Sequence, residues 1–409
     1  MSQARADAAL AVPPIEHEEH HWVVADGTGA SRTARNAGTG PYRSAVVPPI
    51  AGYRPTLPGD LAADVEEAAA ALASFDAYAR SVFGSGSPML GPMGSVLLRT
   101  ESASSSQIEN LTVSARQLAM AEIDQSSSTN AKVVVANVRS METALELADR
   151  LDEDAVLAMH ACLLAGQRGW ERFAGTYRDS LVWIGTSRVS PRGASHVAPQ
   201  PGLVRPAMAD LVAFVSRDDL PVLVQAAVAH AQFETIHPFV DGNGRTGRAL
   251  VHALLHNKGL VTSTTAPVSA GLLRHSERYF DALGTYRAGD ARPIVERFTD
   301  AARYAASSGA RLVDDLAAQL EESRTKMAGL HRNAGAWKVL PHLVAHPVVN
   351  ARYLVNTLAM NDTGAQRALA ALTTCGVLEE RTGLRRNRVW QHQGILTVLD
   401  QYSEGLRRA

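Results

Sequence analysis

Cysteine is scarce in this sequence: Cys162 and Cys375 are the only two among 409 residues. With no CxxC spacing they exclude a disulfide scaffold and fit a reducing compartment, so we expect a cytoplasmic protein. No apolar run approaches the roughly 18–20 residues that span a bilayer, and the N-terminus lacks the basic-then-apolar order of a signal peptide. The net charge is −1, so bulk electrostatics favour neither nucleic acid nor a membrane as partner.

Aromatic residues are also few, at 5% of a chain that is 46% hydrophobic and has alanine-rich stretches. This composition favours helices, and the length favours two or three domains. Residues 1–52 contain Pro13-Pro14 and Pro48-Pro49 and keep no apolar period, which predicts a flexible leader. The sequence from His17 to His21 formally matches the zinc-protease pattern HExxH, but such a site needs a buried helix and a third ligand. We therefore interpret that stretch as a solvated tail.

Helical periodicity begins after the leader. Residues 53–135 are expected to form an N-terminal helical region and residues 136–300 a second domain. The pattern predicts helices over 61–82, from 104 through 118, and over 140–150, 153–164 and 204–215. Residues 175–196 interrupt this rhythm: Leu181–Ile184 and Ser195–Val197 flank a turn at Ser190–Gly193, which predicts a short hairpin.

The most informative stretch is HPFVDGNGRTGR, from His237 to Arg248. A helix is predicted over 221–236, ended by the residue before Pro238, and a second helix over 245–257, closed by Gly259.

The loop between these helices combines the parts of a phosphate-transfer site. Backbone amides of Gly242-Asn243-Gly244 can converge on an anion at the N-terminus of the second helix. Arg245 and Arg248 lie on one helical turn and suit phosphate oxygens. Asp241 can hold Mg²⁺, and His237 can act as a base.

This stretch resembles the Fic-family signature HxFx(D/E)GNGRxxR at every defined position. The resemblance implies that His237 deprotonates a target hydroxyl, that Phe239 packs in the core and that Asp241 binds Mg²⁺. It also implies that ATP is bound by the signature residues Gly242, Asn243, Gly244, Arg245, Thr246, Gly247 and Arg248. Relatives that phosphorylate replace the glycine before the arginine. Since Gly244 is intact, transfer of AMP is favoured, and residues 136–300 would be the Fic catalytic domain.

A second resemblance lies upstream, where SSQIEN over residues 105–110 is similar to the Fic inhibitory motif (S/T)xxxE(G/N). It implies an autoinhibited protein in which Glu109 pairs with Arg248 in place of the γ-phosphate. Asn110 is an accepted variant of the last position. We expect Ser105 to cap the helix that presents Glu109.

The resemblance gives the hairpin and a later helix roles as well. Fic proteins use such a flap to hold the main chain of the target, here through Val182, Ile184, His196 and Val197. The neighbours Tyr279 and Phe280 resemble an aromatic pair that lines the nucleotide pocket, although a pair in a helix core would have the same pattern.

Residues 301–334 are expected to be a helical linker, and residues 335–409 a winged helix-turn-helix domain. Predicted helices cover 336–345, 350–358, 363–375 and 396–406, and strands at 377–380 and 388–391 form a wing. Nine Lys and Arg oppose five Asp and Glu in this part, with Arg385, Arg386 and Arg388 on the wing. Only Gln366 and Arg367 on the second helix suit base contacts, so DNA binding, protein docking and dimerisation stay open.

The sequence thus predicts a mainly α protein: a Fic helical domain with a β-hairpin flap and a C-terminal winged helix. Its expected activity is transfer of AMP from ATP, with Mg²⁺, to a Ser, Thr or Tyr hydroxyl of a target protein or of the chain itself. Two alternatives stay open. One is removal of AMP at the same site, and the other is a nucleotide-sensing transcription regulator.

Overall fold

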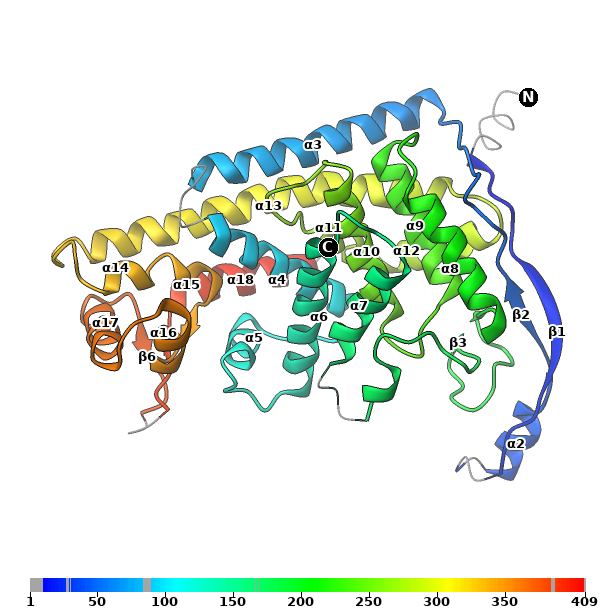
Figure 1. Cartoon of the computed structure of the whole chain (residues 1–409), viewed down its shortest axis with the longest axis horizontal. Helices are drawn as coiled ribbons and strands as arrows, with labels where there is room; N and C mark the ends of the chain where they lie inside the picture. The colour runs from blue at the N-terminus through cyan, green and yellow to red at the C-terminus, as the bar shows by residue number, and fades with distance from the viewer. Residues whose placement is uncertain are drawn as a thin grey trace. The chain divides into compact units, whose positions relative to one another are not determined.

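The structure is a computed structural model that describes residues 10–26, 29, 31–83, 90–165, 167, 169–383 and 387–407. The chain forms two compact units, both mainly helical (Figure 1). Unit 1 comprises Met1–Glu66, Thr143–Lys258 and Glu277–Thr299, and unit 2 comprises Glu67–Glu142, Gly259–Ser276 and Asp300–Ala409. Among the described residues, no helix is long and apolar enough to cross a membrane.

Unit 1 combines a helical core with two small hairpins. Its elements are β1 (Glu16–Trp22), α2 (Arg32–Gly38), β2 (Gly40–Val46), α7 (Glu153–Leu164), the 3-10 turn η2 (Glu171–Phe173), β3 (Trp183–Ile184), β4 (His196–Val197), α8 (Pro201–Val215), α9 (Val222–Ile236), α10 (Asn243–Asn257) and nearly all of α12 (Ser276–Arg287). Three helices contribute residues to both units: α3 (Gly59–Phe83), α6 (Thr129–Glu146) and α13 (Arg292–Lys326).

Helix α9 is the centre of unit 1, since all fourteen residues from Leu223 to Ile236 are buried. A helix without a polar face must be covered on every side. Helices α8 and α10 pack against it, and α7 packs against α10 (Figure 1). Gly247 permits the close approach of α10, because a Cβ there would lie 2.9 Å from the Phe233 ring.

The N-terminal segment differs from the flexible leader predicted for residues 1–52. Strands β1 and β2 pair antiparallel from Glu16↔Val46 to Trp22↔Gly40. The Trp22 indole donates to the Val189 carbonyl over 2.9 Å and meets the Trp183 ring edge-on at 5.4 Å. Polar residues dominate both faces of β1. The alternation of apolar and polar residues that predicts a strand is therefore missing. The HExxH-like stretch lies on β1, which is an extended strand. The zinc-protease pattern places its two histidines one turn apart on a helix, so this stretch does not form such a site.

Unit 2 adds α4 (Leu90–Ile108), α5 (Ala115–Glu122), α11 (Val268–Leu273), α14 (Ala336–Val339), α15 (His342–Ala345), β5 (Val348–Val349), α16 (Ala351–Leu358), α17 (Asp362–Thr374), β6 (Glu379–Glu380), β7 (Trp390–Gln391) and α18 (Gln393–Arg407). The single helix predicted from residue 104 through 118 is wrong. Helix α4 ends at Ile108, and Ser114 caps α5 in a reciprocal capping box with Gln117. The apolar spacing runs across this break in phase, so periodicity alone hides it.

The C-terminal part of unit 2 contains the elements that the sequence predicts. Helices α16, α17 and α18 match the expected ranges to within a few residues, and the strands form an antiparallel sheet in the order β5-β7-β6. The helix predicted over 336–345 is instead two short helices, α14 and α15, separated by Leu340 and Pro341. Arg385 and Arg386 lie outside the described residues.

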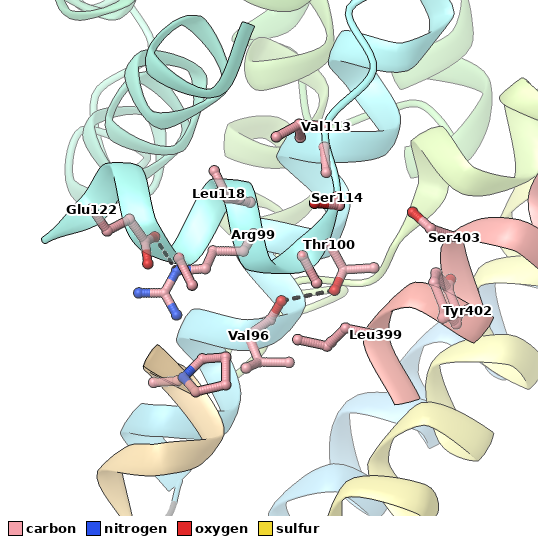
Figure 2. Close-up of a pocket in the computed structure, with 15 residues that line it drawn as sticks. Val96, Arg99, Thr100, Val113, Ser114, Leu118, Glu122, Leu399, Tyr402 and Ser403 are labelled. Atoms are coloured by element: carbon pink, nitrogen blue, oxygen red, sulfur yellow. Dashed lines mark hydrogen bonds and ion pairs between the residues drawn. The ribbon is translucent and has the colours of Figure 1, made fainter. Parts of the chain in front are cut away.

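A small cavity of about 50 Å³ lies between α4, α5 and α18 (Figure 2). Leu399 and Tyr402 of α18 face Val96 and Thr100 of α4 across it (Figure 2). Beside the cavity, the amide of Ala115 donates to Asp400 Oδ1 over 2.9 Å. The chain that follows α4 is therefore attached to the C-terminal helix.

Candidate functional site

The signature loop joins the two central helices of unit 1. Helix α9 ends at His237, which is left-handed (φ 50°, ψ 61°) and donates its amide to the Phe233 carbonyl over 2.9 Å. Pro238 excludes a continuing helix for the residue before it. A non-glycine residue with positive φ is uncommon and needs support from its surroundings.

Arg178 provides this support and was missed by the sequence reasoning. Its Nε donates to the His237 carbonyl over 2.8 Å, its Nη2 to the Pro199 carbonyl over 2.7 Å, and its amide to the Pro238 carbonyl over 3.0 Å. The side chain is 3% exposed, and burial lowers its pKa to about 10. Arg178 therefore stays charged at neutral pH and holds several carbonyls around the His237 turn. Every residue has a main-chain carbonyl, so a side chain that binds carbonyls leaves no pattern of residue types in the sequence. Arg178 could therefore not be identified from the sequence.

The His237 imidazole is placed to accept a proton. Its Nδ1 lies 3.8 Å from Glu234 Oε2, which is beyond hydrogen-bond range, so this carboxylate faces the ring without fixing which nitrogen carries the proton. Burial, together with the positive charges of Arg287 and Arg178, lowers the pKa of His237 to about 3. The ring is therefore neutral at physiological pH, as a general base requires.

Asn243 and Gly242 close the loop. The Asn243 amide group pairs with both main-chain groups of Phe239, at 2.9 Å for each bond. Its side chain is thus used inside the loop and leaves only its backbone to meet a phosphate. Gly242 is left-handed (φ 80°), and a Cβ there would lie 2.7 Å from Leu163 Cδ2. Only glycine fits this position.

His160 of α7 is a second residue that sequence reasoning missed. Its ring stacks on Phe239, with centroids 3.6 Å apart. Its Nδ1 accepts the Gly175 amide over 3.2 Å, so its Nε2 carries the proton and donates to the Asp241 carbonyl over 3.0 Å. Burial lowers its pKa to about 4, so the ring is neutral. Phe239 itself is fully buried, in agreement with its expected packing role.

The two signature arginines lie at the start of α10. Arg245 and Arg248 are each 3% exposed, and Arg245 Nη2 donates to Asp241 Oδ2 over 3.1 Å. The amide of Thr246 donates to the Gly242 carbonyl over 3.0 Å, and this bond begins the hydrogen-bond ladder of α10. Gly247 faces α9 and has a packing role.

Asp241 offers a carboxylate that is 43% exposed. The described residues contain no group of three or more His, Cys, Asp and Glu that could hold a metal ion by themselves. Mg²⁺ commonly binds through one or two carboxylates together with substrate phosphates and water. A single accessible carboxylate beside two arginines fits that mode of binding.

The predicted aromatic pair is divided between interior and surface. Tyr279 is 1% exposed, and its hydroxyl lies 2.8 Å from His230 Nε2. Phe280 is 52% exposed. Tyr279 therefore packs in the core of unit 1, and nucleotide contact stays a prediction for both residues.

The hairpin forms as predicted, with Trp183↔Val197 and Ile184↔His196 in register, and the Val182 carbonyl accepts the Ala198 amide. Ile184 is 38% exposed to solvent, and its contact with a target stays a prediction. His196 and Val197 are buried, and His196 Nε2 lies 2.9 Å from the Thr235 carbonyl. His196 therefore anchors the flap to α9, two residues before His237.

The inhibitory motif belongs to unit 2. Ser105 is fully buried inside α4 and does not cap a helix start. Glu109 follows the last turn, and the turn is closed by Leu111 N–H to the Ser106 carbonyl (3.1 Å) and Asn110 N–H to the Gln107 carbonyl (2.9 Å). These bonds form a Schellman motif with Asn110 left-handed at φ 63°. The last position of the inhibitory motif is Gly or Asn because both residues tolerate the left-handed conformation that Asn110 has here.

Comparison with known proteins agrees with this geometry. Residues 150–255 match the Fic/DOC family model, and residues 62–146 match the model of the N-terminal region of that family. The chain is 29% identical over 150 residues to protein adenylyltransferase fic-1 of Caenorhabditis elegans and 33% identical over 130 residues to protein adenylyltransferase Fic of Aedes aegypti. These matches cover 36% and 31% of this chain, but only 26% and 23% of the relatives.

A crystal structure of a Fic family protein from Desulfovibrio desulfuricans G20 has the same fold, with a TM-score of 0.51 and 23% identity over 83% of this chain and 98% of that one. The chain is therefore mainly helical with small hairpin sheets, and it contains a Fic domain over residues 150–255. Its relationship to the protein adenylyltransferases is distant.

Proposed function

We propose that this protein is an autoinhibited adenylyltransferase that transfers AMP from ATP to a hydroxyl of a target protein. One observation carries the proposal: a neutral, rigidly held His237 lies at one end of a loop whose other end is the N-terminus of α10 with Arg245 and Arg248. Transfer of a nucleotidyl group depends on positioning and on neutralising charge. This loop supplies both.

In the proposed reaction the target hydroxyl gives its proton to the His237 imidazole, and its oxygen attacks the α-phosphorus of ATP. An O–P bond forms, the bond from the α-phosphorus to the bridging oxygen breaks, and pyrophosphate leaves. Arg245 and Arg248 bind the leaving oxygens as their charge grows. Mg²⁺ held by Asp241 would neutralise further phosphate charge. The intact Gly244 supports AMP transfer over phosphoryl transfer, because phosphorylating relatives replace that glycine.

Autoinhibition by Glu109 is part of the proposal. The Schellman turn presents Glu109 at the end of a well-anchored helix, since Asn137 Nδ2 donates to the Ser102 carbonyl over 2.9 Å and to Ser106 Oγ over 3.2 Å. The resemblance to the inhibitory motif supports the further proposal that this carboxylate pairs with Arg248, the proposed γ-phosphate arginine, and so excludes ATP from its productive pose.

We further propose that the C-terminal part of unit 2 is a winged-helix-like module for protein docking or dimerisation. Arg388, the described member of the wing arginines, lies 3.6 Å from Glu380 and over the Trp390 ring at 4.8 Å. Its charge is engaged within the module. This arrangement favours docking over contact with a nucleic-acid phosphate.

Incubation of the purified chain with ATP labelled on the α- or on the γ-phosphate tests the function. We expect stable protein labelling from α-labelled ATP alone, and none with His237→Ala. Labelling from γ-labelled ATP would mean phosphorylation. Release of AMP from a pre-labelled protein would favour the reverse activity, and DNA retardation with no labelling would favour a nucleotide-sensing regulator.

A further inference from the structure

An open groove of about 900 Å³ runs between the N-terminal hairpin, the turn of the flap and the end of α12. This volume is within the range of about 300–1,000 Å³ found for ligand sites. Figure 1 shows β1 and β2 beside the segment that bears β3. The hairpin lies outside the residues that match the two family models, so the groove extends beyond the part of the chain that the family describes.

Hydrogen bonds fix both walls of the groove. Arg192 Nη1 donates to the carbonyls of Ala37 and Thr39, over 2.6 and 2.8 Å, and thereby ties the flap turn to the hairpin. On the other side the amide of Ile15 donates to the Arg287 carbonyl over 3.0 Å. The groove is therefore a preformed feature of unit 1, which lowers the cost of ordering when a partner binds.

The lining is cationic. Its charged residues are three arginines, Arg43, Arg192 and Arg287, and none of its residues is Asp or Glu. Its two histidines, His17 and His196, are uncharged at neutral pH because burial lowers the pKa of each. Glu19 lies opposite Arg43 in the register of the hairpin, but it does not line the groove. A concave surface with one sign of charge favours ligands of the opposite sign.

The groove also leads to the catalytic turn. His196 on its floor lies 2.9 Å from the carbonyl of Thr235, two residues before His237. Arg287 Nη2 donates to the Glu234 carbonyl over 3.3 Å, and Glu234 is the residue whose carboxylate faces His237. A chain bound in the groove and continuing past Arg287 would reach the general base.

We propose that this groove binds an acidic segment of the protein that is to be modified and so selects targets whose hydroxyl has Asp or Glu nearby. The inference rests on the proposed function, because it names the substrate class of the same site. A protein segment fits better than a nucleic acid. Nucleic-acid grooves use open aromatic platforms, whereas Tyr42, the one aromatic residue of the lining, is already stacked on His20 with ring centroids 5.5 Å apart.

Fluorescence anisotropy tests the groove without ATP. Two dye-labelled threonine peptides of equal length would be titrated with the full chain, one flanked by Asp and Glu and the other by Asn and Gln. We expect the acidic peptide to bind about tenfold tighter, from a few partly screened charge contacts, and the preference to shrink with added salt. Arg43→Glu should abolish the preference and Arg43→Lys should retain it. The matched control is Arg54→Glu, an 80% exposed arginine outside the groove, which should change nothing.

Equal binding of the two peptides, or an acidic preference that survives Arg43→Glu, would overturn the proposal. Tighter binding of a single-stranded DNA of equal charge would overturn it as well, since the groove would then be a nucleic-acid site. The same peptides in the α-label assay, with the Glu109→Gly chain, separate the two hypotheses. An acidic preference in binding with no labelling of any protein or peptide contradicts the AMP-transfer proposal and leaves the groove as an acidic-peptide site.

Discussion

Several of the described helices are followed by a left-handed residue other than glycine, and two of these turns are held in different ways. His237 ends α9 in unit 1, and Asn110 follows α4 in unit 2. The first turn depends on the buried side chain of Arg178, from a segment far away in sequence. The second turn is closed by its own main-chain bonds to Ser106 and Gln107. The geometry of the His237 turn is therefore a product of tertiary packing, whereas the Asn110 turn is closed by local bonds.

The largest effect is expected from the catalytic turn. His237→Ala removes the only proton acceptor proposed for the loop, and AMP transfer should fall by about 10²–10⁴-fold. ATP binding should persist, because its contacts come from backbone amides and arginines. Initial rates of α-label incorporation and a separate measurement of nucleotide affinity check this. Unchanged labelling in the variant would exclude His237 as the base.

A rise in activity, rather than a loss, is expected when Glu109 at the proposed inhibitory turn is substituted. If the productive ATP pose is populated at about 1%, freeing it raises activity by up to roughly 100-fold. Glu109→Gly should approach that gain, and Glu109→Asp should be intermediate because its side chain is shorter. Addition of Arg248→Ala should abolish the gain, since Arg248 is also the proposed γ-phosphate ligand. A Glu109→Gly chain no faster than the wild type would remove the autoinhibition hypothesis.

The substitution Arg178→Lys tests whether the position of His237 depends on the guanidinium group of Arg178 or only on its positive charge. A lysine cannot form the same set of bonds to several carbonyls. A small displacement of His237 should lower kcat by about 10–100-fold, with little change in ATP affinity. Arg188→Lys, at an exposed position of the same segment, is the matched control. Equal kcat in both variants would show that the turn holds without Arg178.

Acid should destabilise unit 1 through its buried histidines. Burial is the main cause of the lowered pKa values of His160, His196, His230 and His237, to about 4, 2, 3 and 3. Below pH 6.5 the unfolded chain takes up protons that the folded chain does not. The free energy of unfolding is thus highest above pH 6.5 and falls towards pH 4, by about 1–2 kcal/mol per histidine at pH 5.

Urea denaturation at neutral and mildly acidic pH measures this loss. His230→Gln should make the loss smaller, whereas His331→Gln, at an exposed position, should leave it unchanged. A free energy of unfolding that is independent of pH over this range would contradict the assignment of neutral, buried rings.

The smallest effect is expected from the local turn itself. Asn110→Gly should leave the free energy of unfolding nearly unchanged, while Asn110→Val should lower it by about 1–2 kcal/mol because a branched residue resists the left-handed conformation. Chemical denaturation measures both. Gly242→Ala is the counterpart in the catalytic loop. There the contact with Leu163 adds to the backbone strain, so the loss should be larger. Equal losses would mean that the two turns are held alike.

The sequence by itself determined the helical class, the hairpin and the complete signature loop. Those features are encoded locally: Pro238 ends a helix, Gly242 permits a left-handed turn, and the order of base, glycines and arginines is contiguous. The same local rules located the C-terminal helices and strands closely, because turns and apolar spacing coincide there.

Only the tertiary structure decided the rest. The paired strands β1 and β2 are polar, and they depend on contacts such as Trp22 with Trp183 that no local pattern contains. Arg178 and His160 act on main-chain carbonyls of distant segments, and carbonyls are the same in every residue type. Tyr279 and Phe280 are neighbours in sequence, yet helix packing buries one and exposes the other. Local sequence patterns show which side chains are present and which elements they form. Tertiary packing determines which side chains of distant segments are in contact.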